Sequence, residues 1–125
     1  MRCKNILLID DNDIDNYIHS HLLKKNNIAE HITVKTCAID AIEYLKTIEN
    51  FPCYIFIDIN MPGMNGFEFL TEYDNFISEQ KDSCCIFMLT SSNNKTDIEN
   101  ANNNPYIKKF INKSLTNEML VSMFK

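Results

Sequence analysis

Carboxylates, a hydroxyl group and a lysine follow apolar segments of the sequence, each at the point where a segment ends. These residues are Asp10 and Asp11 after residues 5–9, Asp58 after 53–57, Thr90 and Ser91 after 84–89, and Lys113 after 107–111. If the segments are neighbouring strands, three carboxylates meet, and they repel one another unless a cation joins them. Carboxylate oxygens suit Mg²⁺, which keeps coordination positions for a phosphate. A lysine and a hydroxyl group beside such a metal complete a phosphoryl-binding site.

The central carboxylate of this set is Asp58. The apolar run before it is short, unbroken and closed by turn residues, which is typical of a strand buried on both faces. The only two glycines of the chain, Gly63 and Gly66, follow within a few residues, together with Pro62. In open α/β sheets, ligands bind at the carboxyl ends of the strands. A binding role for Asp58 is therefore predicted, with a simple turn cap as the alternative.

Strand and helix patterns alternate five times along the chain. The predicted strands are 5–9, 32–37, 53–57, 84–89 and 107–111. The first predicted helix runs from residue 14, capped by 12 and 13, to about 24–27. Further helices are predicted over 38–48, 67–77 and 115–124. A polar helix between the last two starts at Asn94 or at a capping box at 96–99. This alternation predicts an α/β fold, a doubly wound five-stranded parallel sheet with helices on both faces, as one domain over residues 1–125.

Composition excludes several classes of protein. With 45% hydrophobic and 23% charged residues in 125, the chain is an ordinary soluble globular domain. A net charge of -5 and the lack of a Lys/Arg cluster argue against nucleic-acid binding. The beginning of the sequence has neither a signal peptide nor a membrane-spanning run, so we expect a cytoplasmic protein with no membrane contact.

Cysteine and histidine patterns predict no further chemistry. The five cysteines are odd in number and contain no Cys-x-x-Cys spacing, so we expect small buried hydrophobic residues instead of a disulfide framework or a metal site. The three histidines lack metal-ligand spacing and are expected at the surface: His19, His21 and His31.

Taken together, the motifs resemble the receiver domains of two-component response regulators, the CheY-like proteins. The matching features, in the family's order and spacing, are Asp10-Asp11, Asp58 followed by Met61, Pro62 and Gly66, then Thr90, Phe110 and Lys113. The resemblance covers the whole chain and implies the (βα)5 flavodoxin-like receiver fold.

The resemblance implies that Asp58 is a phosphoacceptor. Its carboxylate would receive a phosphoryl group from a histidine kinase, a histidine phosphotransfer protein or a small donor such as acetyl phosphate. Mg²⁺, for which Mn²⁺ can substitute, would be ligated by Asp11, Asp58 and the backbone carbonyl of Asn60. Asp10 would act through a metal-bound water.

The resemblance also assigns the response to phosphorylation. Lys113 would pair with a phosphoryl oxygen, Thr90 would hydrogen-bond another, and Phe110 would follow Thr90 inward as the switch aromatic. Such a protein is not an enzyme, although it assists its own phosphorylation and dephosphorylation. It signals through a changed protein-binding surface, and dimerisation on phosphorylation is an option.

Two features depart from the family pattern. Ser114 stands where the family usually has proline after the lysine. Because a cis bond before a residue other than proline costs about 2.5–4 kcal/mol, we expect a trans Lys113–Ser114 peptide. The helix over 96–103 is rich in asparagine, so a face that commonly meets partners is unusually polar.

Other classes of protein fit less well. The acidic stretch that begins at Asp11 is similar to a calcium loop, but Asn16 and Leu22 stand where that loop needs Gly and Glu. A flavin site would need a phosphate-binding loop at 10–13, where the chain is acidic. An aspartate-nucleophile phosphatase using Asp11 and Asp13 would leave Asp58 unexplained. A phosphorylation-independent pseudo-receiver remains the main alternative, and Mg²⁺ binding discriminates it.

Overall fold

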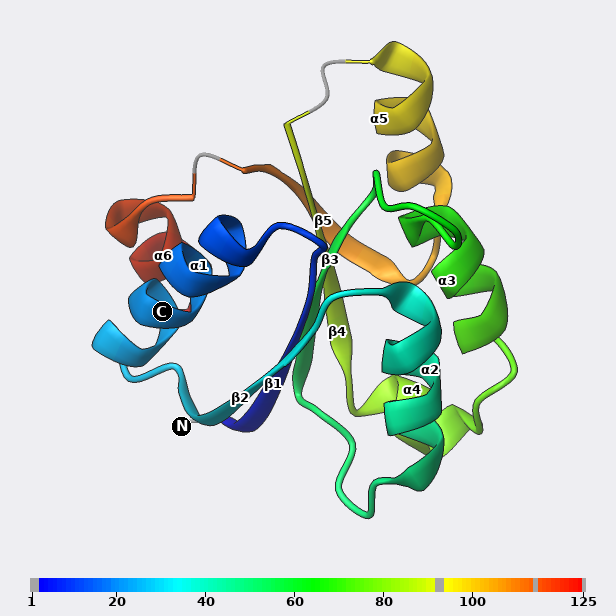
Figure 1. Ribbon diagram of the computed structural model, residues 1–125, viewed down its shortest axis with the longest axis horizontal. Coiled ribbons are helices and arrows are strands. Elements are labelled where there is room, and N and C mark those ends of the chain that lie inside the picture. Colours follow the sequence, from blue (N-terminus) through cyan, green and yellow to red (C-terminus); the bar gives the residue numbers. More distant parts are fainter. Residues whose placement is uncertain (1–2, 92–93, 114, 125) are drawn as a thin grey trace.

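Five parallel strands form one sheet with helices on both faces in the computed structural model, which describes residues 3–91, 94–113 and 115–124, with side chains from residue 5 onward (Figure 1). The strands are β1 (Cys3–Ile9), β2 (Ala29–Lys35), β3 (Tyr54–Asp58), β4 (Cys85–Thr90) and β5 (Ile107–Asn112). The helices are α1 (Asp13–Lys25), α2 (Ala38–Thr47), α3 (Gly66–Tyr73), α4 (Ser78–Asp82), α5 (Lys95–Asn103) and α6 (Asn117–Phe124). The predicted fold class is confirmed.

The strand order β2-β1-β3-β4-β5 creates a switch point between β1 and β3. The chain leaves β1 toward one edge of the sheet to form β2, and it then returns to form β3 on the other side of β1. Ile9 pairs with Ile57 at the carboxyl ends of β1 and β3. The next residue on each strand is therefore an aspartate, and both carboxylates stand beside the switch point.

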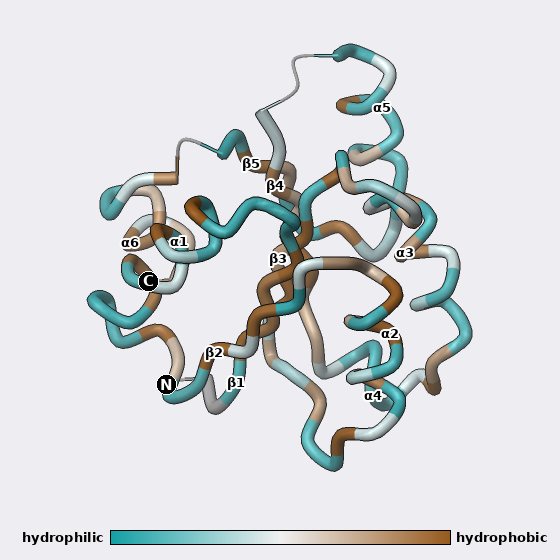
Figure 2. Tube along the Cα trace, in the orientation of Figure 1, coloured by the Kyte–Doolittle hydropathy of each residue, from teal (hydrophilic) through white to brown (hydrophobic). Residues whose placement is uncertain are grey.

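Alternate residues of the strands feed two cores, one on each face of the sheet. Leu7 and Ile9 lie in a cluster with buried residues of α2, α3 and α5, while Ile6 and Leu8 lie in a second cluster with Leu23 of α1 and residues of α6. Figure 2 shows hydrophobic segments concentrated along the strands and hydrophilic ones on the outer turns of the helices. The central strands β1, β3 and β4 are thus buried on both faces, as their apolar runs predicted, whereas the edge strands β2 and β5 are more exposed.

Element boundaries differ from prediction around β2 and α3. β2 begins at Ala29, three residues before the predicted start, and Cys37 is the N-cap of α2, its sulfur accepting a hydrogen bond from the Asp40 N–H at 3.5 Å. The third helix ends at Tyr73 because Asp74 and the residues after it turn the chain. Ile77, which the helical pattern had included, is 61% exposed, and the short α4 follows it.

Of the two predicted starts for the polar helix, the structure shows Asn94. Its side-chain oxygen accepts hydrogen bonds from the backbone N–H groups of Thr96 at 2.8 Å and Asp97 at 3.3 Å, which makes it the N-cap of α5. The capping box predicted at 96–99 is therefore wrong, because those residues already lie inside the first turn.

Two expectations about single residues are wrong. His19 is buried, only 3% exposed, on the side of α1 that faces the sheet. Cys53 is disulfide-bonded, whereas Cys37, Cys84 and Cys85 are free and half-buried. None of the described helices is long and apolar enough to cross a membrane.

Candidate functional site

The three aspartates predicted to converge do so at the carboxyl ends of β1 and β3. Asp10 and Asp58 are buried, with 3% and 4% of their surface exposed, while Asp11 is exposed. One carboxylate oxygen of each residue lies within 4.8 Å of those of the other two. The site thus contains two buried carboxylates and one that is exposed to solvent.

The loop after β3 folds closely over Asp58. The Gly66 N–H donates to the Ile59 carbonyl at 2.9 Å, and a Cβ on Gly66 would stand only 2.8 Å from the Asp58 carbonyl oxygen. Gly66 is therefore required by a close approach of backbone to backbone. The Asn60 N–H donates to the Asp58 carboxylate, so the same loop orients that side chain.

Lys113 brings a positive charge to the three acids. Its backbone N–H donates to the Thr90 carbonyl at 2.9 Å, which ties the end of β5 to the end of β4. Its ammonium nitrogen lies 2.9 Å from a carboxylate oxygen of Asp10, 2.9 Å from one of Asp15 and 3.4 Å from one of Asp58. The predicted convergence of lysine and aspartates is present, with Asp15 in addition.

Burial and charge set the protonation of the two central groups. Burial raises the pKa of Asp58 to about 6, and the neighbouring Asp10 adds to the rise, against the opposing effect of the Lys113 ammonium. Burial alone would lower the pKa of Lys113, but its pairs with Asp10, Asp15 and Asp58 outweigh burial and raise that pKa. At neutral pH, Asp58 is thus ionised and its buried charge lowers the stability of the fold, while the neighbouring Lys113 stays charged.

One face of α1 supports the site and was missed by sequence reasoning. The buried Asn16 side chain donates to the Asp10 carbonyl at 2.8 Å, and His19 hydrogen-bonds the backbone of Lys113. Burial lowers the pKa of His19. The signal was available, because Asp15 and His19 are four residues apart and so share a helix face.

Thr90 and Phe110 lie on adjacent strands. Thr90 is fully buried at the end of β4, and Phe110 on β5 pairs with Met88 and packs, half-buried, against the core on the α2, α3 and α5 side. Since Met88 and Thr90 are two residues apart, they point to the same face of the sheet. The two predicted switch residues are therefore near neighbours, whereas the Lys113–Ser114 peptide falls outside the described residues.

The donor set fits a hard divalent cation. Three carboxylates lie within reach of one ion. The pKa of Asp58 is raised because burial disfavours its negative charge and Lys113 offsets this effect only in part. Oxygen-only ligands of this kind favour Mg²⁺ or Mn²⁺ over softer metals. The residues therefore suit the predicted metal.

Comparisons with known proteins identify the family. Residues 6–125 match the model of the response regulator receiver domain. The chain belongs to this family. No curated protein sequence matches the chain significantly.

Solved receiver structures share this fold along nearly the whole chain. A two-component response regulator from Cytophaga hutchinsonii is 28% identical with a TM-score of 0.86, over 99% of this chain and 96% of its own. A response regulator receiver protein from Dyadobacter fermentans DSM 18053 is 26% identical with a TM-score of 0.86, over 96% and 94% of the two chains. The Vibrio cholerae chemotaxis protein CheY4, at 21% identity and a TM-score of 0.77 over 96% and 94%, shares the fold.

Membership in the family carries a general role. Receiver domains are phosphoacceptors of two-component systems, generally without enzymatic activity, and they typically bind Mg²⁺ through acidic residues. Their phosphoryl groups generally come from histidine kinases or phosphotransfer proteins. The acid cluster of this receiver domain is consistent with that role.

Proposed function

We propose that this receiver domain accepts a phosphoryl group on Asp58 from a histidine kinase or a phosphotransfer protein. One observation carries the proposal: a buried carboxylate at the end of β3 has two further aspartates within 4.8 Å and the Lys113 ammonium at 3.4 Å. That arrangement supplies a nucleophile and, beside it, a positive charge for the oxygens of the incoming group.

The transfer is a displacement at phosphorus. A carboxylate oxygen of Asp58 forms the new P–O bond, while the P–N bond of a phosphohistidine, or the P–O bond of acetyl phosphate, breaks and its electron pair leaves with the donor. With a pKa of about 6, Asp58 is ionised at pH 7 and needs no base to remove a proton. Lys113 then pairs with an oxygen of the transferred group.

Asp11, Asp58 and the backbone carbonyl of Asn60 would hold Mg²⁺, and Asp10 would contact it through water. Bound there, the ion supplies positive charge that offsets the repulsion between the acids and a phosphate. Mn²⁺ has the same preference for oxygen ligands and can substitute. The exposed position of Asp11 supports its role as the ligand most accessible to an entering ion.

We further propose that Thr90 and Phe110 transmit the modification. Thr90 would donate its hydroxyl to the phosphoryl group and Phe110 would repack inward, which alters the surface around β5 and α5. Their positions on adjacent strands, on one face of the sheet, support this relay. The output is a changed surface for another protein, and a pseudo-receiver that never uses Asp58 is the alternative.

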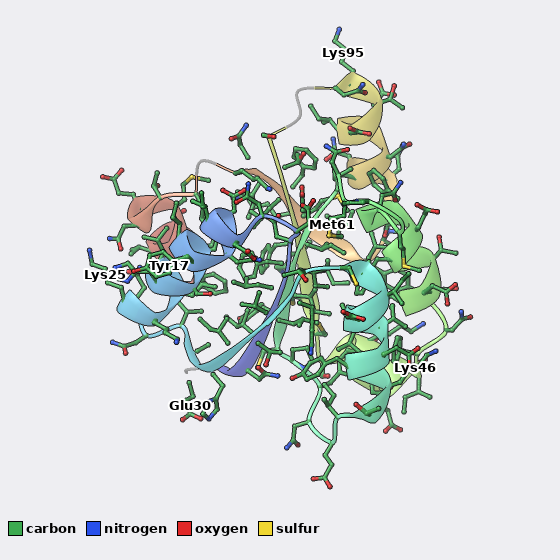
Figure 3. The ribbon with its side chains drawn as sticks, viewed as in Figure 1. Tyr17, Lys25, Glu30, Lys46, Met61 and Lys95 are labelled. Atoms are coloured by element: carbon green, nitrogen blue, oxygen red, sulfur yellow. The ribbon has the colours of Figure 1, made fainter. Side chains whose placement is uncertain are left out.

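The donor is expected to dock on the first turns of α1. Its phosphohistidine must reach Asp58, so it must cover the rim that α1 forms beside Lys113 and Asp15. Ile14 and Tyr17 on this helix are 71% and 74% exposed, and Tyr17 projects from α1 in Figure 3. Exposed apolar side chains at an interaction rim favour a protein partner that buries them.

Incubation with acetyl phosphate tests the proposed chemistry. We expect intact-mass spectrometry to show one phosphoryl adduct on the wild type in the presence of Mg²⁺, a much smaller yield in EDTA, and none on Asp58→Asn. An unmodified wild type under conditions that saturate Mg²⁺ would favour the pseudo-receiver.

A docking test separates the donor surface from the chemistry. With a phosphorylated histidine phosphotransfer protein that modifies the wild type, Tyr17→Ala should slow transfer about tenfold, within the range of interface anchors, yet leave the acetyl phosphate reaction unchanged. Ile77→Ala is the matched control, since Ile77 is also exposed but lies before α4. Equal effects of the two variants would remove α1 as the docking surface.

A further inference from the structure

Asp15 is an acidic neighbour of Lys113 that the proposed chemistry does not use. It lies in the first turn of α1, and its carboxylate is as close to the ammonium, at 2.9 Å, as that of Asp10, whereas Asp58 is at 3.4 Å. An ammonium has three N–H donors. The ammonium donates one hydrogen bond to Asp15, whereas Asp10 and Asp58 face it as ion pairs, so Asp15 holds it before any phosphoryl group arrives.

A phosphoryl oxygen that pairs with Lys113 competes with these carboxylates for the ammonium. Asp10 is a poor candidate, because its carboxylate is buried and also accepts the Asn12 N–H at 3.0 Å. Asp58 itself carries the phosphoryl group. Asp15 remains, and its side chain is 28% exposed, so water can solvate it after the ammonium leaves.

The position of Asp15 on the helix also makes its release inexpensive. It is one of two acidic residues in the first turn of α1, where the unpaired N–H groups and the helix dipole stabilise negative charge without any help from Lys113. The ionised carboxylate of Asp15 is stabilised whether or not the ammonium is bound to it, so Asp15 can hold the ammonium and later release it.

We propose that Asp15 is a positioning residue that holds the Lys113 ammonium in the unphosphorylated state and gives it up to the phosphoryl group. The inference rests on the proposed function of Asp58. Because the pair with Asp15 exists only before phosphorylation, it stabilises the unphosphorylated state and lowers the affinity of the site for a phosphoryl group.

The backbone of Lys113 does not depend on this ion pair. His19 hydrogen-bonds it from the next turn of α1, and its N–H is fixed to Thr90 at 2.9 Å. Loss of Asp15 therefore removes the hydrogen bond that competes for the ammonium but leaves the backbone of Lys113 in place. Asp15→Asn should consequently strengthen binding of a phosphoryl mimic, whereas a merely structural residue would weaken it.

Calorimetric titration with beryllofluoride in excess Mg²⁺ tests this inference. We expect Asp15→Asn to bind about three- to fivefold more tightly than the wild type, the change that corresponds to ~0.6–1 kcal/mol for a partly exposed ion pair. Asp13→Asn is the matched control, because it removes an exposed acid of the same helical turn that is not among the Lys113 partners. Asp15→Glu, which keeps the charge, should restore most of the wild-type affinity.

The outcomes of this titration distinguish failure of the role of Asp15 from failure of the proposed function of Asp58. An affinity of Asp15→Asn equal to or weaker than that of Asp13→Asn would overturn the positioning role while leaving Asp58 as acceptor. A wild type that does not bind beryllofluoride would contradict the proposed function itself and, with it, this inference. Tighter binding by Asp15→Asn alone supports both.

Discussion

The charge on Asp58 should destabilise the metal-free protein, so its removal should stabilise the fold. Burial raises the pKa of this carboxyl from 3.8 to about 6. The folded state therefore binds the proton more tightly than the unfolded state, and the free energy of unfolding falls as pH rises between about 4 and 6. A difference of about two pKa units corresponds to ~3 kcal/mol at 1.36 kcal/mol per unit.

Asp58→Asn removes the charge and keeps the shape of the side chain. In EDTA at pH 7.5, we expect the variant to exceed the wild type in free energy of unfolding by about 2–3 kcal/mol, a large part of the stability of a typical domain. At pH 4 the wild-type carboxyl is largely protonated in the folded state, so the difference should become small.

Urea unfolding followed by circular dichroism, at a series of pH values, measures this difference. Subtracting the two proteins isolates Asp58 from the other acids that titrate in the same range. Asp11→Asn is the control, because it removes an exposed charge from the same cluster and should stabilise less. The reasoning is refuted by an Asp58→Asn variant that is no more stable at pH 7.5, or by a difference that does not change with pH.

Three further predictions address the metal, the relay and the support from α1. Mg²⁺ should raise the Tm of the wild type, since a ligand at 100 times its Kd stabilises the folded state by about 2.7 kcal/mol. Asp11→Ala should reduce that rise in Tm more than Asp10→Ala does. An unchanged rise in Asp11→Ala argues against Asp11 as a metal ligand. Thr90→Ala should still accept a phosphoryl group but show less change in hydrogen exchange over residues 94–113 with beryllofluoride; a response equal to the wild type contradicts the relay. His19→Leu should lower the free energy of unfolding by about 1–3 kcal/mol because the backbone of Lys113 loses a hydrogen-bond partner. His19→Gln should lower it less. Equal stability of His19→Leu and the wild type contradicts this role.

The central strands and the acids at their ends could be predicted from sequence because they obey one rule. Buried parallel strands are short apolar runs, and the side chains that follow them meet at one edge of the sheet. Asp10, Asp58 and Lys113 follow such runs, and the structure brings them together. For these residues, the apolar pattern that predicts each strand also predicts where the side chain after that strand lies.

Boundaries were less predictable where local hydrogen bonds outweigh hydrophobic pattern. Asn94 caps α5 with its side chain, although residues 96–99 carry a capping-box pattern. Ile77 continues the spacing of α3, yet the turn that begins at Asp74 ends that helix first. Such competition depends on backbone geometry that residue spacing does not contain.

The support from α1 was missed for a different reason. Asp15 and His19 look like surface residues of a polar helix, and only the packing of α1 beside the loop after β5 gives them a partner in Lys113. The rotation of a helix about its axis is set by its contacts with the sheet. A histidine four residues after an acid was therefore visible, but its burial was not.

Locating the phosphoryl group tests the central claim most directly. After reaction with acetyl phosphate and Mg²⁺, borohydride reduction converts an aspartyl phosphate to homoserine, and tandem mass spectrometry of peptides assigns the position. We predict homoserine at position 58 and at no other aspartate. Homoserine at position 10 or 11, or a phosphoryl group retained in Asp58→Asn, would contradict Asp58 as the acceptor.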